Sequence, residues 1–178
     1  LGAGTGDLAR EALRVEPACQ ICAADFSFNM MLTGKTRHGQ PRDWAGSDAL
    51  NLPFESNSFD GVVSGFLVRN VVDMDRALNE QLRVLKPGGR MVCLDTTRPR
   101  KSLFSPLIRF YMLRVIPLMG ALIAGNRFAY SYLPQTSREF LPAEEFLARI
   151  QQAGFQQAKF RLLNFKTVAI HWAVKPVG

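Results

Sequence analysis

The chain has 178 residues, 47% of them hydrophobic and 21% charged, which are the proportions of one globular domain with a substantial core. This composition excludes a disordered or collagen-like chain, and three cysteines are too few for a disulfide framework, so we expect a reducing, cytoplasmic compartment. The net charge of +7 belongs to one segment, because residues 96–138 contain seven basic residues and no acidic one.

A glycine loop, Leu1–Gly6 (LGAGTG), opens the chain. Such loops normally follow a buried strand, so we expect the natural N-terminus, with its first strand, to be absent from this sequence; no secretory leader is visible. A helix is predicted over 7–15 and ends before Pro17. A short apolar run over 18–24, ending at Asp25, has the pattern of a buried parallel strand.

The next elements alternate between helix and strand. A helix is predicted over 27–37, a brief strand near Trp44 and a longer strand over 58–66. Asp73 is a predicted helix N-cap, and Lys86–Gly89 (KPGG) stops that helix and turns the chain. These lengths imply right-handed crossovers, so the predicted fold class is α/β with a doubly wound, mostly parallel sheet.

The pattern changes after a strand predicted over 90–95. Residues 103–124 are mostly apolar, but prolines and arginines interrupt them, which argues against a membrane span. We therefore predict a basic, apolar helical insertion over 98–140, acting as a lid or as a homodimer face, within a single domain of residues 1–178.

The chain closes with a helix and a hairpin. The helix opens at Leu141–Glu145 and ends at Gly154, and strands over 155–163 and 165–174 are predicted to pair antiparallel. His171 lies on the second of these strands, where we interpret it as a structural histidine.

Cys19 and Cys22 have the spacing of a redox or zinc motif. On a strand this spacing places the two thiols on opposite faces, and no helix begins there to lower a thiol pKa. We therefore expect packed strand cysteines and no metal.

The glycine loop reads G-x-G-x-G followed by Asp7, where a dinucleotide fingerprint would place a third glycine. A carboxylate at that helix N-terminus would repel a diphosphate, whereas a sulfonium ligand tolerates it. Asp25, at the end of the next strand, is placed to accept hydrogen bonds from ribose hydroxyls, and Asp48, at the end of the third, to meet an adenine amino group. Met30 lines the adenine pocket or belongs to the core.

Seven short elements between residues 1 and 175 carry a family resemblance. They are Leu1–Asp7 (LGAGTGD), Ala49–Phe54 (ALNLPF), Ser58–Asp60 (SFD), Val68–Val71 (VRNV), Arg83–Arg90 (RVLKPGGR), Tyr130–Leu133 (YSYL) and Val168–His171 (VAIH) with Lys175. Together they resemble the ubiquinone/menaquinone biosynthesis C-methyltransferases, which are class I S-adenosylmethionine-dependent methyltransferases. The resemblance implies a seven-stranded sheet with an antiparallel C-terminal hairpin.

The same resemblance implies S-adenosylmethionine as the cofactor. The cofactor contacts that it implies are Gly2, Gly4, Thr5, Gly6, Asp25, Met30, Asp48, Ala49 and Gly65. The chain also departs from the family. Gly65 stands where a serine is common, Leu67 where glycine is usual, and Asp95 and Thr97 where glutamate and serine are commoner.

The family reaction methylates a ring carbon of a prenylated hydroquinone, so a lipophilic quinol is the expected substrate. We expect Arg69 to stabilise the phenolate of that quinol and Asn70 to orient the ring or the local backbone. Phe66, Tyr111 and Tyr130 are the candidate substrate contacts. Because arginine has a very high pKa, water-mediated proton loss is expected rather than direct proton transfer to Arg69.

The basic, apolar insertion suits a substrate held at an anionic membrane surface, which predicts peripheral membrane association. Two alternatives stay open: a class I methyltransferase acting on another small lipophilic acceptor, and a non-catalytic module that binds the cofactor. A nucleic-acid partner is not expected, because long aliphatic residues are interleaved with the basic residues of the segment.

Overall fold

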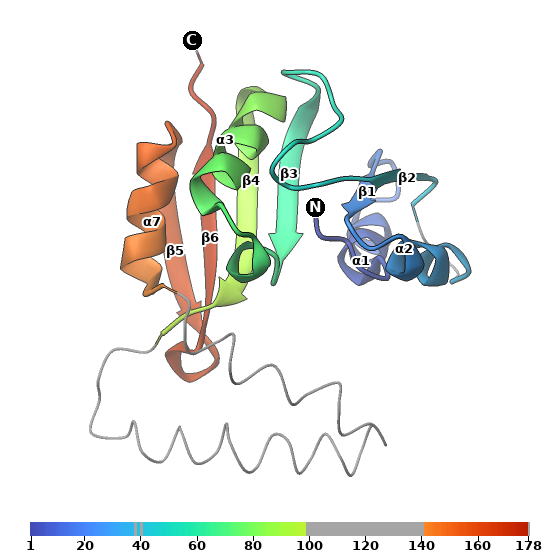
Figure 1. Ribbon diagram of the computed structural model, residues 1–178, viewed down its shortest axis with the longest axis horizontal. Helices are drawn as coiled ribbons and strands as arrows, with labels where there is room; N and C mark the ends of the chain where they lie inside the picture. The colour runs from blue at the N-terminus through green and yellow to red at the C-terminus, as the bar shows by residue number, and fades with distance from the viewer. Residues whose placement is uncertain (38, 40, 99–140, 178) are drawn as a thin grey trace.

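The computed structural model describes residues 1–37, 39, 41–98 and 141–177. The strands in these ranges are β1 (Cys22–Asp25), β2 (Asp43–Gly46), β3 (Phe59–Gly65), β4 (Leu85–Thr96), β5 (Gln156–Leu163) and β6 (Val168–Val174). They form a parallel pair, β1–β2, and a four-stranded sheet in the order β3-β4-β6-β5 (Figure 1). Strands β3 and β4 are parallel, whereas β6 runs antiparallel to both of its neighbours.

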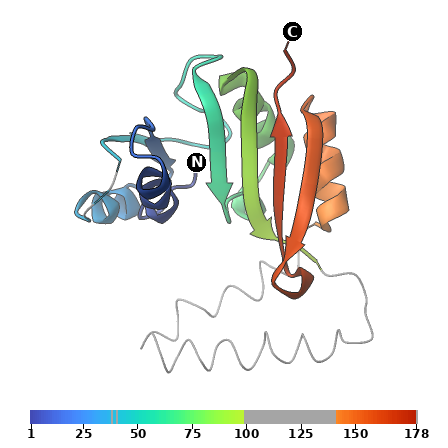
Figure 2. The same cartoon turned by 180° about the vertical axis from the view of Figure 1, so that it is seen from behind.

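The α/β class and the antiparallel C-terminal hairpin are therefore confirmed. The predicted single sheet differs: the described strands form two sheets, because β1 and β3 are not paired with each other. The opening residues lie between these two strands (Figures 1 and 2). The Leu1 amino group donates to Val63 O at 2.7 Å, and Ala3 N donates to Ala24 O at 3.0 Å.

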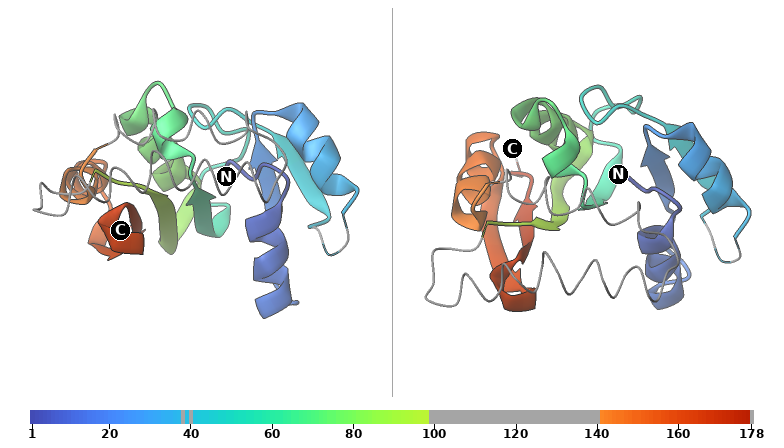
Figure 3. Two further views of the ribbon diagram at one scale, coloured as in Figure 1. Left: turned by 90° about the horizontal axis from the view of Figure 1, so that it is seen from below. Right: turned by 60° about the horizontal axis from the view of Figure 1, so that its bottom comes forward.

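The helices of the described residues are α1 (Asp7–Val15), α2 (Phe28–Lys35), α3 (Met74–Val84) and α7 (Ala143–Gln152), with short 3-10 turns η1 (Val68–Asn70) and η3 (Asn164–Lys166). Helices α3 and α7 cover one face of the four-stranded sheet, and Figure 2 shows the opposite face. Helix α1 lies on the side opposite α3 (Figure 3). None of these helices is both long and apolar enough to cross a membrane.

Several predicted boundaries are confirmed, and three are wrong. The hairpin strand predicted over 165–174 is β6, which begins only at Val168 because the 3-10 turn η3 occupies Asn164–Lys166. Helix α1 spans the predicted residues, and Asp73 caps α3 by accepting a hydrogen bond from Arg76 N at 3.0 Å. Strand β1 begins only at Cys22, because Cys19 N bonds to Glu16 O at 3.1 Å in a turn that follows α1. Cys19 is consequently exposed, so the expectation of a packed strand cysteine is wrong there.

The third wrong boundary concerns the KPGG motif. Helix α3 ends at Val84, before the motif, and β4 already begins at Leu85. Gly88 N donates to Lys175 O at 3.0 Å, and Lys175 N donates to Gly89 O at 2.9 Å. The motif therefore belongs to the start of a strand, where it is paired with the end of the chain.

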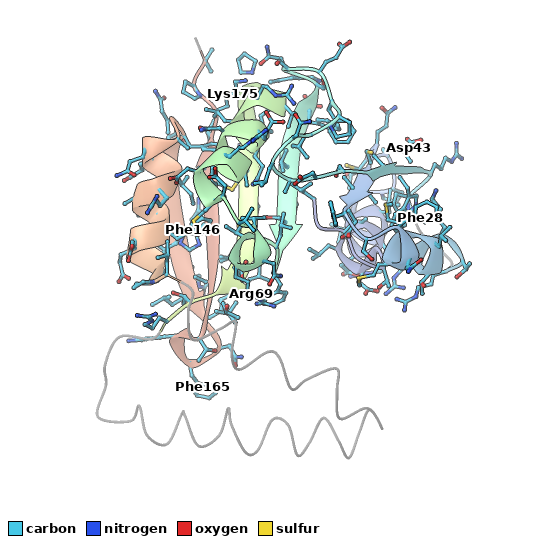
Figure 4. All side chains as sticks on the ribbon, viewed as in Figure 1. Phe28, Asp43, Arg69, Phe146, Phe165 and Lys175 are labelled. Atoms are coloured by element: carbon cyan, nitrogen blue, oxygen red, sulfur yellow. The ribbon has the colours of Figure 1, made fainter. Side chains whose placement is uncertain are left out.

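The apolar core lies between the four-stranded sheet and helices α3 and α7. Leu78, Leu85, Met91, Phe146 and Ile150 are fully buried there. Figure 4 shows Phe146 between α7 and the strands. By contrast, α1 buries none of its residues completely.

Candidate cofactor and acceptor site

The glycine loop has a backbone that only glycine adopts easily. Gly2, Gly4 and Gly6 have φ angles of 65°, 57° and 82°, all in the left-handed region. A Cβ atom on Gly2 would lie 3.0 Å from Leu67 Cδ1, and one on Gly4 would lie 3.2 Å from Met30 Cε. Conformation therefore favours glycine at all three positions, and Gly2 and Gly4 also have close neighbours, in Leu67 and Met30.

Asp25 is anchored in this loop. Its Oδ2 accepts a hydrogen bond from Gly4 N at 2.7 Å, and its Oδ1 accepts one from Ser27 N at 2.7 Å. In a phosphate-binding loop, such an amide points at the phosphate. Here the Gly4 amide already donates to the Asp25 carboxylate. The loop therefore suits a ligand with hydroxyl and amino donors, such as an adenosyl sulfonium.

Asp7 contributes less to this selectivity than its sequence position suggests. The exposed carboxylate lies 2.9 Å from Arg10 Nη2 and 3.2 Å from Arg37 Nη1, and it accepts a hydrogen bond from Thr5 Oγ1 at 2.9 Å. Two arginines therefore neutralise the charge that was expected to repel a diphosphate.

The end of β2 lies beside the end of β1. Asp25 is in register with Gly46, and Ser47 N donates to Asp25 O at 2.9 Å. The next residue, Asp48, is exposed and accepts a hydrogen bond from Leu50 N at 2.9 Å, while Ala49 is buried. The predicted ribose and adenine residues consequently lie at adjacent strand ends.

The segment that follows β3 packs against the glycine loop. The side chain of Leu67 lies against the Cα atom of Gly2, where a Cβ would be crowded. A Cβ on Gly65 would lie 2.7 Å from Leu8 Cδ1 of α1. These contacts bring the predicted cofactor residues and the predicted catalytic segment together. They also account for one departure from the family, because the missing side chain at position 65 leaves room for Leu8.

Phe66 turns the chain between β3 and η1 with a strained backbone. Its φ of 57° is unusual for a residue other than glycine. Phe66 N donates to Leu94 O at 2.7 Å, and Asn70 Nδ2 donates to Phe66 O at 2.9 Å. The Asn70 side chain therefore holds the local backbone, which is one of the two roles predicted for it.

The side chain of Arg69 is buried near the carboxyl ends of β3 and β4 (Figure 4). Its Nη1 lies 3.2 Å from Asp95 Oδ1, and its Cζ lies 4.9 Å from the centre of the Phe66 ring. Burial raises the pKa of Asp95, while hydrogen bonds from backbone amides and the charge of Arg69 oppose that shift. A buried, paired guanidinium thus lies beside the segment that contacts the glycine loop.

His171 has the structural role that was expected. It is buried, its ring stacks on Phe160, and Nε2 lies 2.9 Å from Ala143 O. Desolvation by burial lowers its pKa, so the ring is neutral at physiological pH.

Sequence reasoning missed two residues. Asp95 was noted only as a departure from the family, although an acidic residue at the end of an apolar strand is a usable signal. Gly34 carries no sequence signal of its own: a Cβ there would overlap Trp44 Cη2 and would lie 2.9 Å from Thr5 O. Helix α2 thus touches the glycine loop through this residue. Tyr111 and Tyr130 lie outside the described residues.

The comparison with known proteins fits this geometry. Residues 1–175 match the ubiE/COQ5 methyltransferase family. The chain belongs to this family. The C-methyltransferase UbiE of Desulfotalea psychrophila is 44% identical over 98% of this chain and 72% of its own length. The demethylmenaquinone methyltransferase of Lactiplantibacillus plantarum is 39% identical over 97% of this chain and 75% of its own length.

Solved structures share the fold at lower identity. The [4+2]-cyclase SpnF superposes with a TM-score of 0.73 at 22% identity, covering 99% of this chain and 73% of its own. Human N-acetylserotonin methyltransferase in complex with S-adenosylmethionine gives 0.68 at 20% identity, covering 99% of this chain and 46% of its own. The solved structures show the class I fold, and membership of the ubiE/COQ5 family shows that the chain is an S-adenosylmethionine-dependent methyltransferase.

Proposed function

We propose that this chain methylates a ring carbon of a prenylated benzoquinol or naphthoquinol in ubiquinone or menaquinone biosynthesis. The observation that carries the proposal is the family match over residues 1–175 together with a glycine loop whose Gly4 amide is committed to Asp25. When bound, S-adenosylmethionine supplies an electrophilic methyl group, so the protein has to orient the acceptor carbon and exclude water.

The proposed cofactor residues divide by the part of the ligand that each would hold. The Gly2–Gly6 loop and Gly65 surround the methionine and sulfonium portion, Asp25 accepts hydrogen bonds from the ribose, and Asp48, Ala49 and Met30 border the adenine. Two observations support this arrangement: Met30 Cε approaches Gly4, and the ends of β1 and β2 are adjacent.

On the acceptor side, Arg69 is proposed to stabilise the phenolate whose charge activates the ring carbon, with water accepting the proton. The Phe66 ring is exposed beside Arg69 and is the proposed surface on which the acceptor ring packs. Asn70 holds the carbonyl of Phe66 and so maintains that surface.

The test is incubation with isotope-labelled S-adenosylmethionine and a panel of demethylated benzoquinols and naphthoquinols, followed by mass analysis of the products. Arg69→Ala should reduce turnover while the affinity for S-adenosylhomocysteine stays unchanged, whereas Asp25→Asn should weaken that affinity. Methylation of none of the quinols, with the cofactor bound, would favour another lipophilic acceptor or a non-catalytic module.

Peripheral association with an anionic membrane is proposed from the charge of residues 96–138. Binding to vesicles that contain anionic lipid should fall with salt and with neutralisation of Arg98, Arg100 and Lys101. A matched control neutralises three basic residues elsewhere, Arg14, Arg90 and Lys159. Equal binding to neutral and anionic vesicles would contradict the proposal and would favour the homodimer face, which a solution mass measurement detects.

A further inference from the structure

Asp95 accepts the hydrogen bonds that hold Arg69 in place. It is 2% exposed and lies next to the end of β4. Its Oδ1 accepts hydrogen bonds from Thr96 N at 2.8 Å and from Arg69 Nη1 at 3.2 Å. Its Oδ2 accepts one from Arg69 N at 3.2 Å. One carboxylate therefore ties both the backbone and the side chain of Arg69 to the four-stranded sheet.

The guanidinium of Arg69 is fixed but not fully satisfied. The side chain is 4% exposed, and the Phe66 ring lies 4.9 Å from Cζ. Nη1 is bonded to Asp95, and Thr96 Oγ1 lies 3.5 Å away, yet Nε is buried without a hydrogen-bond acceptor among the described residues. A buried donor without an acceptor is costly, and such donors in native proteins commonly have a ligand or a water as partner.

The ion pair also changes what Arg69 offers to a substrate. Asp95 and Arg69 together carry no net charge, so long-range attraction for an anion is small. What remains is a directed N–H donor, whose effect depends on its orientation. The two hydrogen bonds that Arg69 donates to Asp95 and the contact with the Phe66 ring determine that orientation.

From these contacts, we propose that Asp95 is a positioning residue for methyl transfer: it fixes the direction of the Arg69 guanidinium, so that the buried Nε–H donates to the oxygen of the methyl acceptor once the acceptor has replaced the atoms that cover it. The inference rests on the proposed function, because it assigns the acceptor oxygen as the partner of Nε. Asp95 itself touches neither the acceptor nor the cofactor.

The first experiment is a double-mutant cycle on turnover with a demethylated quinol. Asp95→Asn should lower kcat by up to about a hundredfold, the loss expected when a catalytic group is displaced, with the affinity for S-adenosylhomocysteine unchanged. In an Arg69→Ala background, Asp95→Asn should cause no further loss. Losses that multiply would overturn the inference, since Asp95 would then act independently of Arg69.

Conservative variants test the orientation directly. Asp95→Glu keeps the carboxylate and should retain kcat within about threefold, whereas Arg69→Lys keeps the charge but lacks the Nε donor and should lose as much as Arg69→Ala. Arg69→Lys with normal turnover would overturn the inference. These two variants also decide the matter if Asp95→Asn fails to fold. Asp60→Asn is the matched control, because it breaks an exposed ion pair with Lys86.

A spectroscopic measurement needs no substrate and so separates this inference from the proposed function. In nitrogen-15-labelled protein, Arg69 should give a protected Nε–H resonance, identified by its loss in Arg69→Lys. Asp95→Asn should broaden or abolish that resonance, and Asp95→Glu should keep it. An unchanged resonance in Asp95→Asn would refute the positioning role, whereas a wild-type protein that methylates no quinol would count only against the proposed function.

Discussion

The two sheets of the molecule hold their functional residues in different ways. Around the glycine loop, α1 buries none of its residues completely, and the shape of the loop comes from left-handed glycines and from hydrogen bonds to Asp25. The four-stranded sheet has a continuous apolar core with α3 and α7, and its functional candidate, Arg69, is held by a buried ion pair.

This difference matches what each region has to do. Under the proposed function, the cofactor region would recognise its ligand with backbone and carboxylate groups, and ligand binding would stabilise this region, few of whose side chains are buried. The acceptor region keeps a guanidinium in one orientation, which needs a rigid, packed support. Cofactor binding and core stability should therefore respond to different mutations.

The largest expected effect is on the core of the four-stranded region. Phe146 is fully buried, and its ring lies 4.8 Å from that of His171. Phe146→Ala should lower the free energy of unfolding by about 3–5 kcal/mol, measured by chemical denaturation. The control in the cofactor region is Val15→Ala on α1. Because the Val15 side chain is exposed, this substitution should change the free energy of unfolding by less than about 0.5 kcal/mol. Equal losses would contradict the contrast between the regions.

The next effect is confined to the cofactor region. A methyl group on Gly34 would overlap Trp44 Cη2 and the Thr5 carbonyl, so Gly34→Ala should push α2 away from the glycine loop. Overpacking of this kind costs about 1–3 kcal/mol, and if that cost falls on the bound state, the affinity for S-adenosylhomocysteine drops by about 5- to 150-fold, measured by calorimetry. Gly46→Ala is the control, because its Cβ would lie 3.7 Å from Met31 Cε. A similar loss in both variants would show that the contact is not specific.

Sequence patterns predicted the elements of both regions well, because local signals define them. The helix over 7–15 and the N-cap at Asp73 follow from side-chain spacing and capping chemistry, which need no tertiary information. The late start of β1 was missed, since the turn that delays it depends on one backbone hydrogen bond from Cys19.

The contacts within the site could not be predicted in the same way. Glycine spacing indicated the loop, but the ion pairs of Asp7 with Arg10 and Arg37 and the pair between Arg69 and Asp95 join residues whose proximity only the fold creates. Gly34 belongs to the same class, because its necessity comes from Trp44 and Thr5 on other elements.

Acid should weaken the four-stranded region specifically, because the buried histidine lies there. Desolvation lowers the pKa of His171 below its ordinary value of about 6.5. As the pH falls through that value, His171 becomes protonated in the unfolded chain but stays neutral in the native protein. The free energy of unfolding therefore falls until the pH has passed the native pKa. The slope from this group is at most about 1.4 kcal/mol per pH unit. His171→Gln should show a shallower decline than the wild type in unfolding experiments between pH 7 and pH 5, and parallel declines would contradict the assignment.

The smallest expected effect separates the two carboxylates of the glycine loop. Asp7 is exposed and shared between Arg10 and Arg37, and exposed ion pairs contribute less than about 1 kcal/mol. Asp7→Asn should therefore change the affinity for S-adenosylhomocysteine by less than about fivefold. Asp25→Asn, the contrasting variant, removes the anion that holds Gly4 N and should reduce that affinity about tenfold or more, since hydrogen bonds to charged groups contribute about 1.5–3 kcal/mol.

The Asp7→Asn variant also tests ligand selectivity, with a nicotinamide nucleotide as the probe. If the charge of Asp7 excluded diphosphates, Asp7→Asn would begin to bind the nucleotide. We expect no binding, because the Gly4 amide that a diphosphate needs still donates to Asp25 after Asp7 is neutralised. Nucleotide binding by Asp7→Asn would show that the charge of Asp7 is what excludes diphosphate ligands. It would also show that the cofactor region depends on its exposed charges, as well as on the geometry of its backbone.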